Sequence, residues 1–302
     1  MGDARRPGRA VRGRTAAARG PRTRGAGLVR TERAGWGTYA LLAVFTAVSL
    51  FPLVWTAVAA SRTSTRLAAT PPPFRFGRNL PRNLELAWTD ARLGEALVNT
   101  ALVAGAVSAG TVLFSTLAGF AFAKLRFRFR GTLLLLVAGT MLIPPQLGVV
   151  PLYLVIARLR WTDELQAVVL PSLVSAFGVF FMLQHLRRAL PAEVLEAARM
   201  DGAGTLRTVW HVVLPAARPA MAVLGMLSFV AAWNDFFWPV LALTQTGNPT
   251  VQVALTGLGR GTVPDQSVVM AGALLGTLPL LVVLALFGRH IVGGVMRGAV
   301  KG

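Results

Sequence analysis

Long stretches without a charged residue divide the chain into apolar and polar segments. Asp, Glu, Lys and Arg are absent from residues 34–61, 96–123, 131–157, 165–186 and 266–288. A sixth stretch, 219–259, is interrupted only by Asp235, and its Gly247-Asn-Pro249 sequence favours a loop. A helix that crosses a bilayer core of roughly 30 Å needs about 20 apolar residues. The pattern predicts an all-α membrane protein with six transmembrane helices at about 36–60, 97–123, 132–157, 165–186, 219–243 and 267–288.

The composition supports a membrane location for this apolar body. Hydrophobic residues make up 54% of the 302 residues and charged residues only 14%, with a mean hydropathy of +0.58. A net charge of +19 is typical of nucleic-acid-binding proteins, but those need far more polar sequence around their basic residues. Basic loops on a membrane-embedded body account for both values. We therefore expect a lipid bilayer, and no nucleic acid, as a partner.

Basic residues alternate between the two ends of the predicted spans. The segments 1–34, 124–130 and 187–218 and the C-terminal end together hold 22 Lys and Arg, whereas the intervening segments hold 9. Because short basic loops are retained in the cytoplasm, both termini are predicted to be cytoplasmic. Residues 1–34 contain ten Arg and almost no large apolar side chain, so we expect a disordered cytoplasmic tail ahead of a transmembrane domain over 35–302.

The sequence carries no motif of an enzyme. A GxxxxGK[ST] phosphate-binding loop is absent, and the only lysines are Lys124 and Lys301. The three histidines lack metal-ligand spacing, and the absence of cysteine excludes thiolate sites and disulfides. We therefore expect no catalytic residue, no metal and no cofactor in this chain. Only Asp235 qualifies as an acidic or basic residue near the midplane, whereas proton- or sodium-coupled carriers usually place several there.

The polar segment 187–218 has the pattern of two short helices. Pro191 can open the first helix, residues 192–200 are mostly good helix formers, and Gly202 can provide a left-handed stop. The second helix is predicted from an apolar face formed by Leu206, Val209, Trp210 and Val213. We expect Leu214-Pro215 to turn the chain into the fifth span. The segment is thus predicted to be a cytoplasmic helix-turn-helix.

The centre of the first helix is small and flanked by acids. Ala197 and Ala198 permit close approach of another backbone, and Glu196 and Asp201 offer partners to basic groups. Such a helix is suited to dock into a neighbouring protein. An ordinary amphipathic helix at the membrane interface has the same spacing and is the alternative interpretation.

A longer pattern in this segment resembles a known family. Glu196-Ala197-Ala198, Gly202, Val212 and Leu214-Pro215 match the EAA loop of binding-protein-dependent ABC importer permeases, with Val212 where Ile is usual. Five further segments resemble the carbohydrate-importer branch, of maltose type: Asn99-Thr100, Pro144-Pro145, Pro151-Leu-Tyr153, Trp233-Asn234-Asp235 and the terminal Gly298-Ala-Val-Lys-Gly302. The resemblance covers about 36–302. It implies the type I ABC importer permease fold.

The resemblance also implies what the chain does and with which partners. The family imports a solute delivered by an extracytoplasmic solute-binding protein, and a separate ABC ATPase subunit uses the ATP. A second permease subunit, as a heterodimer, supplies the other half of the pathway. The implied location is the bacterial-type plasma membrane. The implied ATPase-coupling residues are Glu196, Ala197, Ala198, Asp201, Gly202, Leu214 and Pro215.

Two places in the spans are candidates for the transport pathway. Trp233 and Asn234 beside Asp235 offer an aromatic face and an amide that suit a polyol. Asp235 also suits interhelical packing, the interpretation that we favour, because polar residues in helix bundles commonly bond to a neighbouring helix. Pro144-Pro145 interrupts the backbone hydrogen bonds of the third span, which indicates either a pathway-lining kink or a packing bend.

The sequence is also compatible with two functions other than sugar import. The same machine could import another polar solute, such as glycerol phosphate. The chain could instead be a self-contained channel or secondary carrier, which would transport in liposomes without ATP or partners. The identity of the solute retained by the cognate binding protein distinguishes a sugar permease from a permease for another polar solute.

Overall fold

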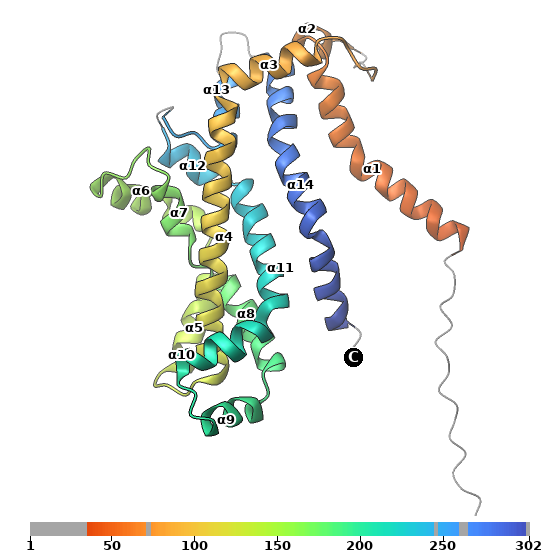
Figure 1. Ribbon diagram of the computed structural model, residues 1–302. Coiled ribbons are helices and arrows are strands. Elements are labelled where there is room, and N and C mark those ends of the chain that lie inside the picture. Colours follow the sequence, from red (N-terminus) through yellow and green to blue (C-terminus); the bar gives the residue numbers. More distant parts are fainter. Residues whose placement is uncertain (1–34, 71–73, 245–246, 260–264, 300–302) are drawn as a thin grey trace, which may run out of the picture. The chain divides into compact units, whose positions relative to one another are not determined.

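Helices form all the regular structure in the computed structural model, which describes residues 35–70, 74–244, 247–259 and 265–299, with side chains to residue 288 (Figure 1). No strand occurs in these ranges, which confirms the predicted all-α class. The elements are α1 (Trp36–Ala60), α2 (Ser64–Leu67), α3 (Leu80–Asp90), α4 (Leu93–Lys124), α5 (Arg130–Thr140), η1 (Pro145–Gly148), α6 (Val149–Arg158), α7 (Gln166–Ser172), α8 (Ala176–Ala189), α9 (Ala192–Met200), α10 (Thr205–Thr208), η2 (Val209–Val213), α11 (Leu214–Trp233), α12 (Phe237–Ala242), α13 (Val251–Leu258) and α14 (Gln266–Ala299).

The chain separates into two units, residues 1–49 and 50–302. Among the described residues, the first unit holds the beginning of α1, whose side chains are exposed up to Ser49. The second unit holds the end of α1 and all the later helices. The predicted tail, residues 1–34, lies outside the described residues.

Among the described residues, four helices are long and apolar enough to cross a bilayer: α1, α4, the continuous helix Thr205–Trp233 and the Gln266–Gly288 part of α14. Two further candidate spans are bent pairs. Arg130–Thr140 and Pro145–Arg158 meet at 95°, and Gln166–Ser172 and Ala176–Ala189 meet at 40°. When each pair counts as one span, the structure has six, in the predicted order.

The bends change the expected shape of the third and fourth spans. The predicted helix 132–157 is broken after Thr140, because Pro144 and Pro145 lack the N–H groups that an α-helix needs at these positions. The predicted helix 165–186 is broken near Leu173. There Ser175 caps the start of α8 by accepting a hydrogen bond from the Gly178 N–H at 3.1 Å.

The fifth span begins earlier and ends earlier than predicted. Its helix runs unbroken from Thr205 to Trp233, so Leu214-Pro215 does not turn the chain. A π-helical segment, η2, precedes the proline, and the Leu214 N–H donates to the Val209 carbonyl five residues back. This wider spacing continues the helix up to Pro215, which has no N–H to donate. After Trp233 the helix stops, and the remainder of the predicted 219–243 span forms the short α12.

The core of the second unit forms around α4, which packs against α8 and α11 (Figure 1). Small residues allow the α4 and α8 backbones to approach closely. A methyl group added at Gly119 would lie 2.8 Å from the Leu183 nitrogen, and one at Gly178 would lie 2.3 Å from the Ser115 hydroxyl. Ser115 itself is fully buried. The contact is the small-residue packing expected of membrane helices.

Successive loops between the spans lie at opposite ends of the second unit. The end that carries α9 and α10 also carries the 124–130 loop and the end of α8, whereas α3 and α13 lie at the opposite end (Figure 1). There the buried Asn83 amide donates to the Ala60 and Arg62 carbonyls at 2.8 and 2.7 Å and ties α1 to α3. Burial opposes ionisation of Asp265, but hydrogen bonds from Ser267 and Ser64 outweigh it and lower its pKa.

Candidate functional site

Helix α9 has clear sequence signals at both ends. Pro191 precedes the helix in an extended conformation, φ −59° and ψ 152°, and the nine residues from Ala192 to Met200 follow it. Gly202 has φ +74°, which confirms the predicted left-handed stop. The Ala203 N–H donates to the Ala198 carbonyl at 2.9 Å, and the Gly202 N–H donates to the Arg199 carbonyl at 3.0 Å. These two bonds make a Schellman motif.

The predicted coupling residues lie mostly on the free surface of this helix. Glu196, Ala197, Asp201 and Gly202 are exposed, and Ala198 is half-buried. The small centre of the helix is therefore open to a partner, with carboxylates beside it. The other two predicted coupling residues, Leu214 and Pro215, lie at the start of α11, half-buried and exposed respectively.

One side chain joins α9 to the membrane helices. Leu195 is 7% exposed and belongs to a cluster of buried residues that takes members from α4, α8, η2 and α11. Its other members are Phe120, Met182, Leu186, Leu190, Val209, Val213, Ala217, Ala220 and Leu224. Leu195 belongs to none of the sequence motifs described above. The sequence does offer a signal that Leu195 is buried, since it is one of two large apolar residues among the alanines and glutamates from Ala192 to Ala198.

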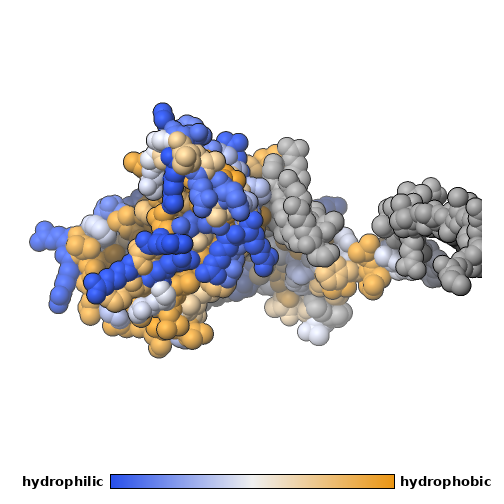
Figure 2. Space-filling model, turned by 90° about the horizontal axis from the view of Figure 1, so that it is seen from below, coloured by the Kyte–Doolittle hydropathy of each residue, from blue (hydrophilic) through white to orange (hydrophobic). Residues whose placement is uncertain are grey.

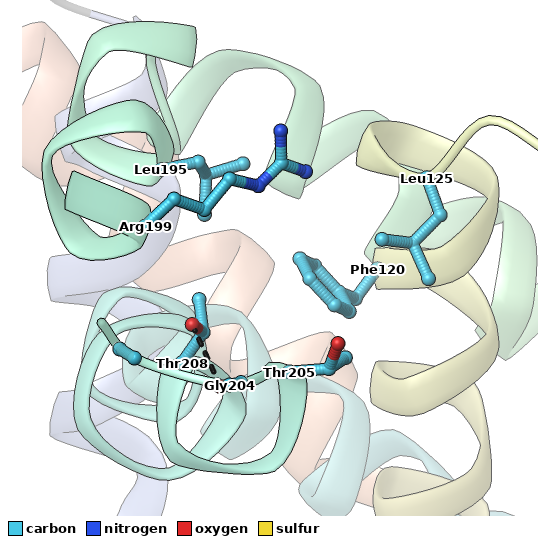
Figure 3. A pocket seen from close by; sticks show the side chains of 8 residues that line it. Phe120, Leu125, Leu195, Arg199, Gly204, Thr205 and Thr208 are labelled. Atoms are coloured by element: carbon cyan, nitrogen blue, oxygen red, sulfur yellow. Dashed lines mark hydrogen bonds between the residues drawn. The ribbon is translucent and has the colours of Figure 1, made fainter. Parts of the chain in front are cut away.

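A small pocket of about 150 Å³ lies beside this anchor (Figure 3). Phe120 and Leu125 line it from the end of α4, and Leu195 and Arg199 from α9; Ala203, Gly204, Thr205 and Thr208 complete it. The Arg199 side chain reaches from α9 towards Phe120 and Leu125 (Figure 3). The Thr208 hydroxyl donates to the Gly204 carbonyl at 3.1 Å. The pocket thus lies between α9, α10 and the end of α4.

The second helix buries only half of its predicted apolar face. Val209 and Val213 are buried in the cluster, whereas Leu206 and Trp210 are 78% and 66% exposed. The π-helical hydrogen bonding of η2 alters the side-chain spacing on which the predicted face depended. Met200, at the end of α9, is 88% exposed as well. Large apolar side chains are therefore exposed both at the end of α9 and on the helix that follows it.

The Gly202 conformation gives a test of how α9 must end. In Gly202→Val the left-handed conformation becomes unfavourable by about 1–2 kcal/mol, whereas Gly202→Asn tolerates it. Since no atom lies within 4 Å of the position that a Cβ would occupy, the two variants differ mainly in backbone conformation. On the coupling role that the family resemblance implies for α9, the valine variant should lose at least half of the ATP-dependent uptake in proteoliposomes and the asparagine variant should keep most of it. Equal activity would show that the Schellman turn is dispensable.

The predicted pathway residues have different environments. Trp233 is buried, and its Nε1 donates to the Gly276 carbonyl at 3.1 Å, so its indole joins α11 to α14. Asn234 is exposed and donates to the Val230 carbonyl at 2.8 Å. The half-buried Asp235 carboxylate faces the backbone N–H groups of Phe237 and Trp238, where α12 begins. Its described contacts are thus local to the break between the two helices.

Pro144 and Pro145 are both exposed at the 95° break of the third candidate span. The neighbouring Leu142, Ile143 and Leu147 are also exposed, at 86%, 57% and 71%. Within the described ranges no three His, Asp or Glu side chains come together in an arrangement that could hold a metal ion. The candidate site is the exposed surface of α9.

Comparison with known proteins places this geometry in a family. Residues 112–297 match the model of the binding-protein-dependent transport system inner membrane component. The sn-glycerol-3-phosphate transport system permease protein UgpE of Yersinia pestis is 31% identical over 255 residues, covering 82% of this chain and 90% of that protein. The lactose transport system permease protein LacG of Rhizobium radiobacter is 27% identical over 263 residues, covering 87% and 95%.

A solved structure shares the fold. A bacterial ABC transporter involved in the import of the acidic polysaccharide alginate has a chain that superposes with a TM-score of 0.72 at 21% identity, over 84% of this chain and 95% of its own length. The matched family segment contains α8 to α11 and with them the whole α9 surface. The chain therefore belongs to the binding-protein-dependent transport system inner membrane components and is a multi-pass plasma-membrane permease subunit of an ABC importer.

Proposed function

We propose that this permease subunit translocates a sugar and that α9 docks on a separate ABC ATPase subunit. The relatives support the solute class, since one of them is named for lactose transport. The observation that carries the docking role is the open Glu196-Ala197-Ala198 surface on a helix whose Leu195 is buried among α4, α8 and α11. A displacement of α9 would reach three candidate spans through this side chain.

Glycerol phosphate is the second candidate solute. The relatives named for sn-glycerol-3-phosphate transport are 30–31% identical to this chain, slightly more than the 27% of the lactose permease. An extracytoplasmic binding protein would deliver either solute. Isothermal titration of the cognate binding protein with lactose, maltose and sn-glycerol-3-phosphate tests the choice. Retention of glycerol phosphate and of neither sugar would contradict the sugar assignment.

A second permease subunit is part of the proposal. The break between α5 and η1 leaves irregular backbone with exposed neighbours in a candidate span. In a bilayer such backbone is stable only where protein or a water-filled cavity covers it. A partner permease across the pathway would supply that cover, and the Pro144-Pro145 break would face it. We also propose that α9 lies on the cytoplasmic side of the membrane, because the segments at its end of the chain's spans hold most of the Lys and Arg residues.

Charge reversal on α9 tests the docking role directly. Glu196→Lys places a cation where the proposed ATPase surface expects a carboxylate, and loss of one charged hydrogen bond costs about 1.5–3 kcal/mol. We expect at least a tenfold loss of solute-stimulated ATPase activity in proteoliposomes that contain the full importer. Glu85→Lys, on the exposed surface of α3 at the opposite end, is the matched control and should retain activity. Full coupling in Glu196→Lys would remove α9 as the docking element.

A further inference from the structure

A basic and aromatic loop lies beside the α9 surface and has no role in the docking proposal. Residues 124–130 read Lys-Leu-Arg-Phe-Arg-Phe-Arg and join α4 to α5, two apolar helices. The loop therefore lies where a candidate span leaves the bilayer. Arg126, Phe127, Arg128 and Phe129 are all exposed, and Figure 2 shows long hydrophilic side chains among hydrophobic ones at this end of the molecule.

Contacts hold the two ends of the loop in place. Leu125 is half-buried and packs against the cluster that contains Leu195. The Arg130 side chain donates to the Leu125 carbonyl at 3.5 Å, and Lys124 Nζ donates to the Arg187 carbonyl at 3.3 Å. The latter bond brings the exposed Arg187 and Arg188, at the end of α8, next to the loop. Basic residues from two separate elements thus lie close together.

Acidic residues are absent from the loop's own part of the chain. No Asp or Glu occurs in residues 96–162, and none of the loop's basic side chains forms an ion pair within the part of the chain that the structure describes. Positive charge at the C-terminal ends of α4 and α8 interacts favourably with the helix dipoles, but this effect is confined to the last turn of each helix. Arg126 and Arg128 lie beyond it. They remain available to an anion.

The aromatic residues indicate which kind of anion fits. Phe129 has φ +61°, a conformation that favours glycine, yet it is a large side chain that is 63% exposed. Phe127 is 39% exposed, and the centroid of its ring lies 5.7 Å from that of Phe122 in α4. The Arg128 guanidinium carbon lies 5.0 Å from the centroid of the Phe129 ring. Exposed aromatic rings beside cations are typical of the boundary between acyl chains and headgroups. A soluble anion would not require them.

We propose that the 124–130 loop, with the adjacent end of α8, binds the headgroup of an anionic phospholipid. Arg126 and Arg128 contact the phosphate, and Phe127 and Phe129 lie among the upper acyl carbons. Because Leu125 lines the same pocket as Leu195 and Arg199, the bound lipid lies next to the contact that holds α9. The proposal concerns lipid binding and does not depend on which solute is transported.

Lipid retention by the purified importer tests this proposal. The complete importer in detergent is mixed with equal amounts of dioleoyl phosphatidylglycerol and dioleoyl phosphatidylcholine, and the retained lipids are counted by native mass spectrometry. Each basic residue near an anionic surface contributes about fivefold to binding, so Arg126→Gln with Arg128→Gln should lower phosphatidylglycerol retention about thirtyfold. The Arg126→Lys, Arg128→Lys pair, which keeps the charge, should lose fivefold or less.

The matched control removes two charges elsewhere in the basic sequence. Arg5→Gln with Arg6→Gln lowers the net charge equally and should leave phosphatidylglycerol retention within twofold of the wild type. Equal loss in both glutamine pairs would overturn the site, because general attraction would then explain the binding. Unchanged lipid retention with weaker ATPase association in Arg126→Gln, Arg128→Gln would overturn it as well and would assign the loop to a protein contact.

Discussion

Leu195→Asp is expected to abolish solute uptake by the reconstituted importer. Truncating a buried Leu costs about 2–5 kcal/mol, and an aspartate there adds an unpaired charge in an apolar cluster. Helix α9 has nine residues, and Leu195 is its buried side chain, so this loss exceeds what its remaining contacts can supply. The helix should separate from α4 and α8. We expect uptake of radiolabelled solute in proteoliposomes to fall by more than a hundredfold.

Leu195→Met is the control at the same position. It conserves the apolar volume, a change that usually costs less than about 1.5 kcal/mol, and should keep most of the uptake. Both variants should insert into the membrane at wild-type levels, because α4 also packs against α8 and α11 through residues that do not touch α9, such as Gly119 and Ser115. Normal uptake by Leu195→Asp would mean that α9 acts without being anchored to the spans.

Gly119→Val should reduce the stability of the permease itself. The added Cβ would lie 2.7 Å from the Met182 Cβ and 2.8 Å from the Leu183 nitrogen, and the backbone nitrogen cannot yield without moving α8. Overpacking typically costs about 1–3 kcal/mol, and this position belongs near the upper end. We expect a clear fall in the temperature at which the purified chain loses its monodisperse peak in size-exclusion chromatography.

Gly105→Val is the matched variant on the same helix. It makes the same change in side chain and helix propensity, but no atom lies within 4 Å of its added Cβ. Its thermal stability should stay close to that of the wild type. If the two variants lost stability equally, the cost would come from the helix propensity of Val and not from the contact between α4 and α8.

The elements that could be predicted from the sequence are those set by local composition. Apolar stretches of membrane length predicted the order of the spans, and Gly202 predicted the stop of α9, because a left-handed residue is a local requirement. The family resemblance rested on the α9 segment and agrees with the family match over 112–297. The ATPase-coupling roles of Glu196, Ala197 and Ala198 stay predictions until the docking experiments are done.

The features that were missed depend on contacts between distant residues. The pathway role of Trp233 stays a prediction, and nothing in the sequence indicates that the carbonyl of Gly276, 43 residues away, accepts its indole N–H. Pro215 was expected to turn the chain, whereas the π-helical bonding before it lets the helix continue. The amount of bending at Pro144-Pro145 was not predictable either, since proline removes hydrogen bonds without fixing the angle that results.

The continuous helix from Thr205 to Trp233 has a preferred plane of bending. Pro215 and Pro219 are four residues apart, so their missing hydrogen bonds lie along the same side of the helix. A helix opens most easily on the side where its hydrogen bonds are absent. Force applied at the α10 end would therefore tilt α11 in one direction and meet more resistance in others, so the sequence itself gives the fifth span a hinge axis.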